Sequence, residues 1–215
     1  CECVKARYAK LLKEQLSSVL PIADQNFSKF DMSFYSTRPD GRSGISPREN
    51  MEYNLGECKA YAAKFSKDSP NLLLFGSTGL GKTFLSTCIA EAVSARGFSV
   101  AYDTAINIVA AYETIKFGSG DGEAAAERAA RYERADLLII DDMGTEMGTA
   151  FTVSALYNLI NNRLMAKRPM IINTNLLPET LSEKYSPAVA SRLLGEFLPL
   201  RFFGDDIRLL KMRRT

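Results

Sequence analysis

Short apolar runs alternate with longer segments of helical periodicity along most of this chain. The short runs end in polar or glycine-rich residues, so we expect them to be buried strands. The expected strands are residues 71–75, 98–102, 136–140, 170–174 and 198–203. The expected helices between them are residues 82–96, 105–117, 123–134, 151–166 and 187–196. This alternation predicts an α/β fold with one parallel sheet that helices cover on both faces.

The region before the first strand has a different pattern. Residues 4–20 carry apolar positions at helical spacing and are expected to form a charged amphipathic helix that Pro21 ends. Residues 22–47 are rich in Asp, Ser, Gly, Pro and aromatic residues. We expect them to form an irregular linker whose aromatic side chains pack on the following domain.

A second helix is expected before the sheet begins. Ser46 and Pro47 are typical of an N-cap followed by proline at the first helical position, and the helix should run to about Phe65. We therefore divide the chain into an N-terminal helix and linker, residues 1–47, and an α/β domain, residues 48–215.

A glycine-rich segment follows the first expected strand and precedes a helix. It reads Gly-Ser-Thr-Gly-Leu-Gly-Lys-Thr and fits the phosphate-binding pattern G-x-x-x-x-G-K-[ST] in full. Glycines let backbone amides approach phosphate oxygens, the lysine reaches the terminal phosphates, and the threonine hydroxyl binds Mg²⁺. The expected nucleotide site contains Gly76, Ser77, Thr78, Gly79, Leu80, Gly81, Lys82, Thr83 and Phe84. The alternative is a glycine-rich turn with a chance lysine, and the flanking strand and helix argue against it.

Two aspartates follow the apolar strand at residues 136–140. Ligands of open α/β sheets bind at the carboxyl ends of the strands. Asp141 is therefore expected to hold Mg²⁺ together with Thr83, and Asp142 to polarise the attacking water as a general base. The alternative is a solvated strand end, but the phosphate motif upstream favours a role in catalysis.

Polar residues also follow the strand at residues 170–174. We expect Asn175 to contact the γ-phosphate or the attacking water, with Thr174 as the second choice; capping of the next turn is the alternative. We expect Arg192, on the following helix, to be exposed, to reach the γ-phosphate of a neighbouring subunit and to stabilise the charge of phosphoryl transfer. The alternative for Arg192 is a surface arginine in a weak ion pair. Arg208 is a further candidate for a phosphate contact, within the same subunit.

Five segments together resemble one family. They read Gly-Ser-Thr-Gly-Leu-Gly-Lys-Thr, Leu-Leu-Ile-Ile-Asp-Asp-Met-Gly-Thr-Glu, Ile-Ile-Asn-Thr-Asn-Leu, Ser-Arg-Leu-Leu-Gly and Gly-Asp-Asp-Ile-Arg. Over most of residues 30–211 the chain is similar to the bacterial DnaC/DnaI helicase loaders and their transposition relative IstB. These proteins are AAA+ ATPases that use ATP, ADP and Mg²⁺.

The resemblance implies a P-loop AAA+ domain with a parallel five-stranded sheet in the order 5-1-4-3-2. It implies that Arg192 is the arginine finger and Asn175 the first sensor, and that the helices between residues 105 and 134 form an insert that contacts single-stranded DNA. Few residues follow Phe203, so the C-terminal lid is expected to be reduced or absent, which weakens the case for Arg208. Many AAA+ ATPases have Glu in place of Asp142, so hydrolysis is expected to be slow or to need a partner.

The cysteines give information about metal content and compartment. Cys1 and Cys3 resemble the end of the zinc-binding N-terminal module of some loaders, although two incidental cysteines are the alternative. Because they supply only two of the four ligands of a tetrahedral site, we expect no zinc in this chain. The chain starts at Cys1 and not at Met, from which we expect a segment upstream. Cys58 and Cys88 are expected to be core residues of a cytoplasmic protein.

The 215 residues carry a net charge of only +2, so a nucleic-acid contact must come from a local patch. Lys116 and Phe117 end one insert helix, and Arg128, Arg131 and Arg134 recur on the next. A cation beside an aromatic ring suits phosphate contact with base stacking. The interspersed glutamates equally fit a solvated helix face. No apolar run is long enough to span a membrane.

The leading hypothesis is an ATP-driven loader that places the replicative helicase on single-stranded DNA and self-associates through a nucleotide-bridged interface. The first alternative is an IstB-like helper of transposition that acts on duplex DNA. A small-molecule kinase with the same P-loop is the second, although the arginine-rich lid that usually closes over the phosphates of such kinases is not visible. A nucleotide switch that scarcely hydrolyses ATP, because Asp142 replaces Glu, is the third.

Overall fold

The computed structural model describes residues 25–41, 43–118 and 120–213, together with Cys3, residues 6–8 and Lys10. The expected helix at residues 4–20 lies largely outside these residues. The strands are β1 (Asn71–Gly76), β2 (Val100–Thr104), β3 (Leu137–Met143), β4 (Met170–Thr174) and β5 (Phe197–Phe202). The helices are α2 (Pro47–Lys64), α3 (Lys82–Ala95), α4 (Ala105–Phe117), α5 (Gly122–Arg134), α6 (Ala150–Met165), α7 (Pro178–Lys184), α8 (Pro187–Glu196) and α9 (Ile207–Met212). Two short 3-10 helices, η1 (Phe27–Lys29) and η2 (Met32–Phe34), precede α2.

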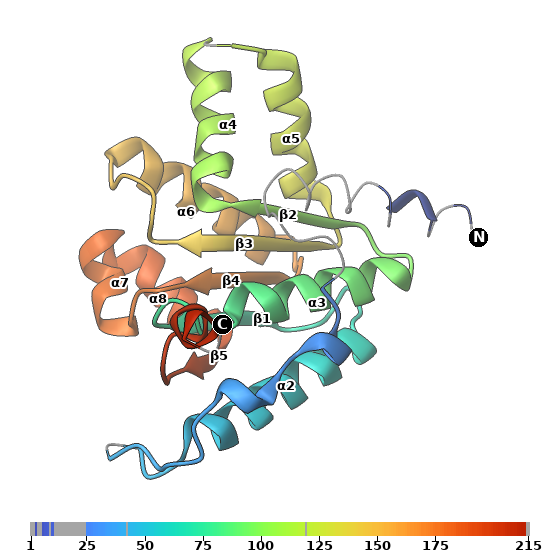
Figure 1. Ribbon diagram of the computed structural model, residues 1–215. Coiled ribbons are helices and arrows are strands. Elements are labelled where there is room, and N and C mark those ends of the chain that lie inside the picture. The colour runs from blue at the N-terminus through green and yellow to red at the C-terminus, as the bar shows by residue number, and fades with distance from the viewer. Residues whose placement is uncertain are drawn as a thin grey trace.

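All five strands are parallel and form one sheet in the order β2-β3-β4-β1-β5 (Figure 1). This is the order 5-1-4-3-2 that the family resemblance implies, and it is confirmed. Because the strands are parallel, their carboxyl ends lie at the same edge of the sheet. The register places Thr104 beside Asp141, and Phe75 beside Thr174. The segment after β1 therefore starts close to the two aspartates of β3.

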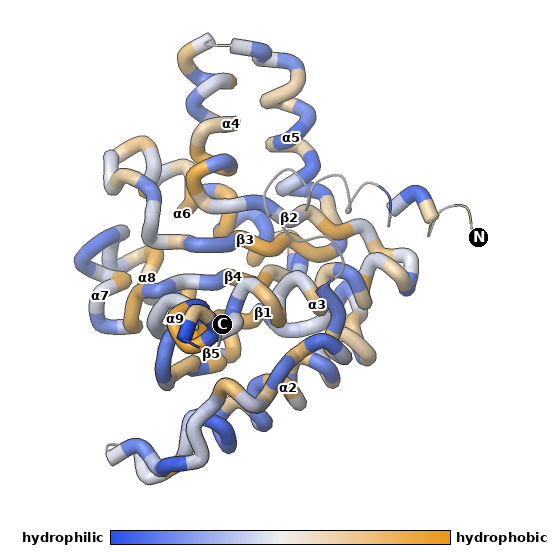
Figure 2. The backbone as a smooth tube through the Cα atoms, viewed as in Figure 1, coloured by the Kyte–Doolittle hydropathy of each residue, from blue (hydrophilic) through white to orange (hydrophobic). Residues whose placement is uncertain are grey.

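The two faces of the sheet carry separate apolar cores, as the two-residue period of a strand requires. One core joins α2 and α3 to alternate strand residues such as Leu74, Ile139 and Ile171. The other joins α4, α6 and α8 to the intervening residues, such as Leu73 and Ile140. Figure 2 shows hydrophobic stretches along the strands of the sheet. The predicted sheet with helices on both faces is confirmed.

Several elements differ from the prediction. β3 does not stop at residue 140 but continues through both aspartates to Met143, with an irregularity in its pairing to β4. β2 begins at Val100 and not at residue 98. The helices α7 and α9 were not predicted, because seven and six residues are too few to show a helical period. Between β5 and residue 213, α9 is the only helix that the structure describes.

The linker before α2 packs on the domain through its aromatic residues. Tyr35 is buried in the core of the α3 face, and Phe27 and Phe30 pack partly buried against it. Ser46 is the N-cap of α2: its hydroxyl accepts from the Glu49 amide, and the Glu49 carboxylate accepts from the Ser46 amide. The predicted start of this helix is confirmed, since such a capping box satisfies amides that the first turn leaves unpaired.

The helices α4 and α5 form a hairpin that projects away from the sheet (Figure 1). The base of the hairpin is held to the domain by buried residues, among them Ile108 on α4 and Tyr132 on α5. Its far end carries exposed side chains, including Phe117, of which 64% is exposed. No helix in the described part of the chain has the length and hydropathy of a membrane-spanning segment.

Candidate nucleotide site

The glycine-rich segment forms a tight loop between β1 and α3. Gly76, Gly79 and Gly81 have φ angles of +137°, +71° and +94°, which side chains disfavour. A Cβ atom at Gly76 would lie 1.9 Å from the carbonyl oxygen of Phe202 on β5. The glycines thus allow a close turn that leads directly into the start of α3. Such a turn is suited to an anion of the size of a phosphate.

Lys82 begins α3, and its side chain folds back over the loop. Its Nζ atom donates to the carbonyl oxygens of Gly76 at 2.6 Å and Ser77 at 2.7 Å. Burial lowers the pKa of Lys82 to about 8, against the opposing charges of Asp142 and Asp141. Because an ammonium group has three protons, one donor remains for a phosphate oxygen.

The Thr83 hydroxyl and Asp141 bring two oxygen ligands together. Thr83 Oγ1 donates to Asp141 Oδ1 at 3.2 Å, although 58 residues separate the two in the chain. Hydroxyl and carboxylate oxygens are the hard ligands that Mg²⁺ prefers, and Mg²⁺ commonly completes its shell with water and substrate phosphates. The donor set therefore fits the cation that a P-loop nucleotide brings with it.

Asp142 is half-buried beside this pair, with a φ of +51°. Burial and the charge of Asp141 raise the pKa of Asp142, while Lys82, Arg208 and a hydrogen bond from the Asn175 side chain act in the opposite direction. A carboxylate with a raised pKa is a stronger base, as the proposed role of Asp142 requires. Asn175 thus lies beside Asp142. Thr174, the second choice, instead donates its hydroxyl to the Met143 carbonyl at 2.6 Å and is buried.

The two candidate arginines have different positions. Arg208, at the start of α9, is exposed, and its charge acts on both Lys82 and Asp142; a role for Arg208 within its own subunit stays a prediction. Arg192 is half-buried on α8 and makes no hydrogen bond or ion pair with any residue that the structure describes. A contact between Arg192 and a phosphate of a neighbouring subunit stays a prediction.

Two supporting contacts around the loop were not predicted. The amide of Ile207 donates to the Gly79 carbonyl at 3.0 Å, and a Cβ atom at Gly79 would lie 2.0 Å from Asp206 Oδ1. The segment that starts α9 therefore lies directly against the P-loop. The Tyr35 hydroxyl donates to the Leu80 carbonyl at 3.0 Å from the linker side.

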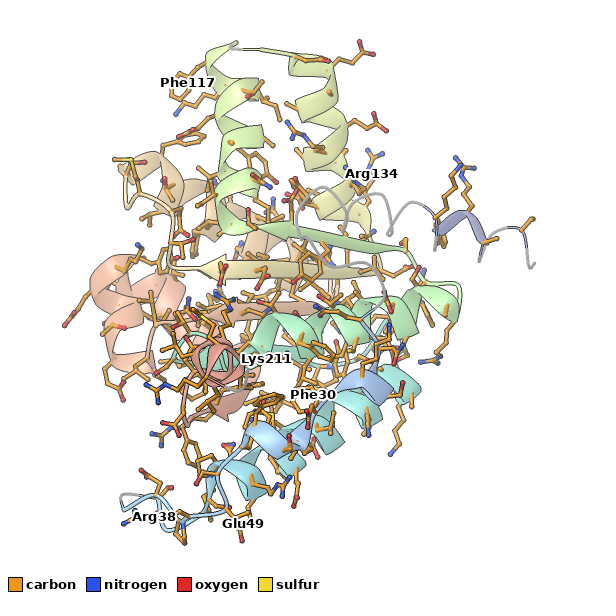
Figure 3. The ribbon with its side chains drawn as sticks, in the orientation of Figure 1. Phe30, Arg38, Glu49, Phe117, Arg134 and Lys211 are labelled. Carbon is orange, nitrogen blue, oxygen red and sulfur yellow. The ribbon has the colours of Figure 1, made fainter. Side chains whose placement is uncertain are left out.

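Phe84 packs towards this linker. Its ring meets Phe30 edge-on at 5.4 Å, and Phe30 in turn stacks on Tyr35 at 5.7 Å. Figure 3 shows Phe30 where the linker crosses the domain. The aromatic contact supports the first turn of α3, and a direct contact between Phe84 and nucleotide stays a prediction.

Sequence reasoning missed the partners that hold the carboxylate of Asp141. The Tyr102 hydroxyl donates to its Oδ2 atom at 2.8 Å, and Asn173 Nδ2 donates to Oδ1 at 2.8 Å. Both residues are buried, on strands β2 and β4. The signal that could have revealed them is a polar residue at a strand position that faces the core. Asn173, for example, lies two positions after Ile171 and therefore on the same face of β4.

A second buried carboxylate lies close behind Asp142 in the chain. Glu146 is only 5% exposed; it accepts from the Gly144 amide at 3.0 Å and from the Tyr185 hydroxyl. Tyr185 immediately precedes Ser186, the N-cap of the helix that carries Arg192. The contact joins the loop after the aspartates to α8, and no local pattern could reveal it because the partners are 39 positions apart in the chain.

The basic residues of the insert do not form a single patch. Lys116 and Phe117 lie at the projecting end of α4, where Lys116 Nζ is 4.8 Å from the ring centroid of Phe151 and the two phenylalanine rings are 5.6 Å apart. Arg128 is exposed on α5, and Arg131 is half-buried towards its C-terminal end. Figure 3 places Phe117 at the tip of the hairpin and Arg134 at its base.

The cysteines have separate locations. Cys58 and Cys88 are buried, as expected, and Cys3 is exposed. Cys1 lies outside the described residues, so the structure leaves the predicted remnant of a zinc module as a prediction. Among the residues that the structure describes, no group of three or more His, Cys, Asp or Glu side chains could hold a metal ion.

The chain is similar to proteins of DNA replication and of mobile elements. It is 25% identical to the replicative helicase loader DnaC of Escherichia coli K12 over 185 residues, which are 80% of this chain and 75% of DnaC. It is 27% identical to an ATP-binding protein of an insertion sequence in Mycobacterium tuberculosis, over 60% of this chain and 50% of that protein.

Solved structures show the same fold. A crystal structure of the DnaC helicase loader is similar with a TM-score of 0.65 and 16% identity over 83% of this chain and 97% of that one. AMPPCP-bound DnaA from Aquifex aeolicus also has a TM-score of 0.65, with 20% identity over 88% of this chain. The chain spans about half of the solved DnaA chain, 55% of its length. The P-loop AAA+ fold class with five parallel strands is therefore confirmed.

A family model described as IstB-like ATP binding protein matches residues 58–196. The match covers well over half of the chain and includes the glycine-rich loop, both aspartates of β3 and Arg192. The protein therefore belongs to the family of IstB-like ATP-binding proteins, which are P-loop ATPases of the AAA+ class.

Proposed function

We propose that this protein is an ATP-driven loader that places a replicative helicase on single-stranded DNA. The observation that carries the proposal is the assembled nucleotide site in a chain that matches 75% of the length of a helicase loader. The match to the insertion-sequence protein covers only 50% of that relative. The wider match supports the loader over the transposition helper.

The site residues have distinct proposed roles in hydrolysis. The amides of residues 76–83 and the Lys82 ammonium hold the phosphates of ATP or ADP, and Thr83 and Asp141 hold Mg²⁺, which neutralises phosphate charge when bound. Asp142 accepts a proton from the attacking water, and Asn175 beside it orients that water. Since Asp142 is one methylene shorter than Glu, hydrolysis is slow until a partner completes the site.

Arg192 provides the proposed link between subunits. Its side chain has no partner among the described residues, so it is available to a γ-phosphate on a neighbouring copy. Arg192→Ala is expected to lower the ATPase rate by about 10³-fold while sparing ATP binding. Arg96→Ala, at the opposite end of α3 from the P-loop, is the control. An unchanged rate in Arg192→Ala would remove the nucleotide-bridged interface from the proposal.

The tip of the α4–α5 hairpin is the proposed contact with single-stranded DNA. Lys116 lies 5.4 Å from the Phe117 ring and 4.8 Å from the Phe151 ring, so a phosphate and a base can meet a cation and an aromatic face together. Phe117→Ala is expected to weaken binding to a labelled oligonucleotide by about tenfold, in the presence of ATP. Met165→Ala, a similarly exposed apolar residue on α6, is the control.

The loader proposal is tested by association with the replicative helicase of the same organism. Pull-downs with ATP, with ADP and with Lys82→Ala are compared. Capture of the helicase is expected to depend on the nucleotide and to be altered by Lys82→Ala, because the lysine contacts the loop that holds the phosphates. Absence of the helicase from all three samples would contradict the proposal.

A transposition helper is the second candidate, because the matching family model is the IstB-like one. That candidate requires ATP-dependent binding to duplex DNA and recruitment of a transposase. Binding of equal lengths of single-stranded and duplex DNA therefore separates the two. A preference for the duplex, together with no helicase capture, would favour transposition.

A further inference from the structure

Four buried side chains form a closed ring of hydrogen bonds that includes Asp141. Tyr102 and Asn173 each donate to one of its carboxylate oxygens, at 2.8 Å in both cases. Both also meet Ser86 on α3: Asn173 Nδ2 lies 2.7 Å from Ser86 Oγ, and the Tyr102 hydroxyl lies 3.4 Å from it. Three of the four members stand outside the nucleotide-binding motifs.

The ring follows from the alternation of side chains along three neighbouring strands. Tyr102, Asp141 and Asn173 lie on β2, β3 and β4, on the face of the sheet that α3 covers. Their side chains and Ser86 are at most 1% exposed. Apolar residues would be expected at these positions. The four side chains hydrogen-bond to one another beneath the first turns of α3. The Oδ1 atom of Asn173 is the exception, because it is buried and accepts no hydrogen bond from the residues that the structure describes.

The ring orients Asp141 without neutralising it. A buried carboxylate is costly unless it is hydrogen-bonded or paired with a cation. In the described part of the chain, Asp141 has neutral donors and forms no ion pair with lysine or arginine. A cationic partner would compete with a divalent ion, whereas hydroxyl and amide donors leave the full negative charge available to it.

The carboxylate also needs an outside restraint on its rotation. The terminal torsion of aspartate has a broad energy profile, so the side chain itself does not fix the plane of the carboxylate. The Tyr102 hydroxyl holds Oδ2, and Asn173 holds Oδ1. These two contacts leave Oδ1 at 3.2 Å from the Thr83 hydroxyl.

We propose that Tyr102 and Asn173 are positioning residues that preset the magnesium ligand Asp141 beside Thr83. The inference rests on the proposed Mg²⁺–nucleotide site. Outer partners of metal ligands commonly change metal affinity by about 10- to 100-fold when removed. Loss of either donor therefore weakens the use of Mg²⁺, while the amides of the loop and Lys82 still hold the nucleotide.

The chain contains a matched control for both residues. Asp103 is a nearly buried carboxylate outside the site, and it accepts from the Tyr132 hydroxyl at 2.7 Å and from Asn107 Nδ2 at 2.7 Å. Tyr132→Phe and Asn107→Ala therefore remove the same chemical groups from the same type of acceptor. They each remove one hydrogen bond from a carboxylate without touching Asp141.

The experiment measures the binding of a fluorescent ADP analogue as Mg²⁺ is varied, and also in EDTA. Tyr102→Phe and Asn173→Ala are each expected to raise the half-maximal Mg²⁺ concentration about tenfold, with unchanged binding in EDTA. Tyr132→Phe and Asn107→Ala are expected to match the wild type in both conditions. Thermal denaturation establishes that each variant is folded. The tyrosine variant with its tyrosine control, or the asparagine variant with its asparagine control, is sufficient for the test.

Two outcomes would overturn the inference. In one, the folded test variants keep the Mg²⁺ dependence of the wild type; in the other, the control variants shift it equally. A different result, in which Mg²⁺ does not affect nucleotide binding to the wild type at all, would overturn the proposed magnesium site itself. The failure of the positioning role and the failure of the site are thus distinguished by the wild-type curve.

Discussion

Lys82 Nζ lies 2.6 Å from the carbonyl oxygen of Gly76, so the lysine that is expected to bind phosphate also contacts its own loop. This contact and the one to Ser77 give hydrogen-bond acceptors to the ammonium group of Lys82, a residue of which only 5% is exposed. Burial lowers the pKa of Lys82 to about 8, which means that the charged form is less favourable in the folded protein than in an exposed lysine.

Lys82→Met is expected to separate stability from function. Nucleotide affinity should fall by about 100-fold, since a charge-assisted contact is lost. The melting temperature should stay the same or rise, because a buried ammonium is replaced by an apolar side chain of similar length. Fluorescent-nucleotide titration and thermal denaturation measure the two effects, with the exposed Lys64→Met as the control. A large loss of stability would show that the contact to Gly76 holds the loop together.

Gly76→Ala is expected to disrupt the junction of β1 and β5. The added Cβ atom would meet the Phe202 carbonyl oxygen at 1.9 Å, at a φ of +137°. We expect a loss of about 2 kcal/mol or more in the free energy of unfolding, together with loss of nucleotide binding.

Gly56→Ala is the matched substitution in the same protein. Nothing lies within 4 Å of a Cβ atom at Gly56, which is inside α2, so we expect a gain of about 0.5–1 kcal/mol. Urea denaturation of both variants measures the difference. Equal effects at the two glycines would contradict the steric argument.

Tyr185→Phe is expected to slow hydrolysis without weakening ATP binding. The variant leaves one oxygen of the buried Glu146 without its hydroxyl donor, in the loop that follows Asp142. Loosening that loop and the start of α8 should lower kcat about tenfold. Steady-state kinetics and equilibrium binding give the two quantities, and Tyr157→Phe on α6 is the control. A change confined to ATP affinity would be inconsistent with this coupling.

Arg163→Met is expected to be strongly destabilising, although the side chain is far from any proposed chemistry. The fully buried guanidinium donates to the carbonyl oxygens of Tyr132, Glu133, Ala135 and Pro169. Leaving these acceptors unpaired should cost about 3 kcal/mol or more in the free energy of unfolding. Arg96→Lys, at an exposed arginine that bonds a single carbonyl, should cost less than about 1 kcal/mol. Urea denaturation compares them, and similar losses would count against the carbonyl network.

The buried thiols of Cys58 and Cys88 are expected to make the free energy of unfolding fall at alkaline pH. Burial raises the pKa of each thiol from 9.0 to about 12. A folded-state pKa above the unfolded value means that this stabilisation is complete below the unfolded pKa and is lost as pH rises towards 12. Between about pH 8 and pH 9.5, each thiol should lower the free energy of unfolding by about 1 kcal/mol. Urea unfolding at both pH values should show a smaller fall in the free energy of unfolding for the double variant Cys58→Ala/Cys88→Ala than for the wild type. An equal fall in the two proteins would contradict the raised pKa values of the thiols.

The sequence alone determined the features that depend on neighbouring residues. The glycine-rich loop, the apolar strands and the capping box at Ser46 can each be recognised from a short stretch of sequence. This is possible because backbone conformation and side-chain period are local properties. They were sufficient to predict the fold class and the segments that meet at the carboxyl edge of the sheet. The helices α7 and α9 escaped prediction because each spans fewer than two helical periods.

Only the tertiary structure decided which distant side chains meet. Tyr102 and Asn173 lie 39 and 32 residues from Asp141 in the chain, and Tyr185 lies 39 residues from Glu146. These partners are set by the strand order and register and by the packing of α3 and α8, which no local pattern encodes. Hydrogen bonds form between groups that the completed fold brings within reach, so the environment of a carboxylate is a property of the whole sheet.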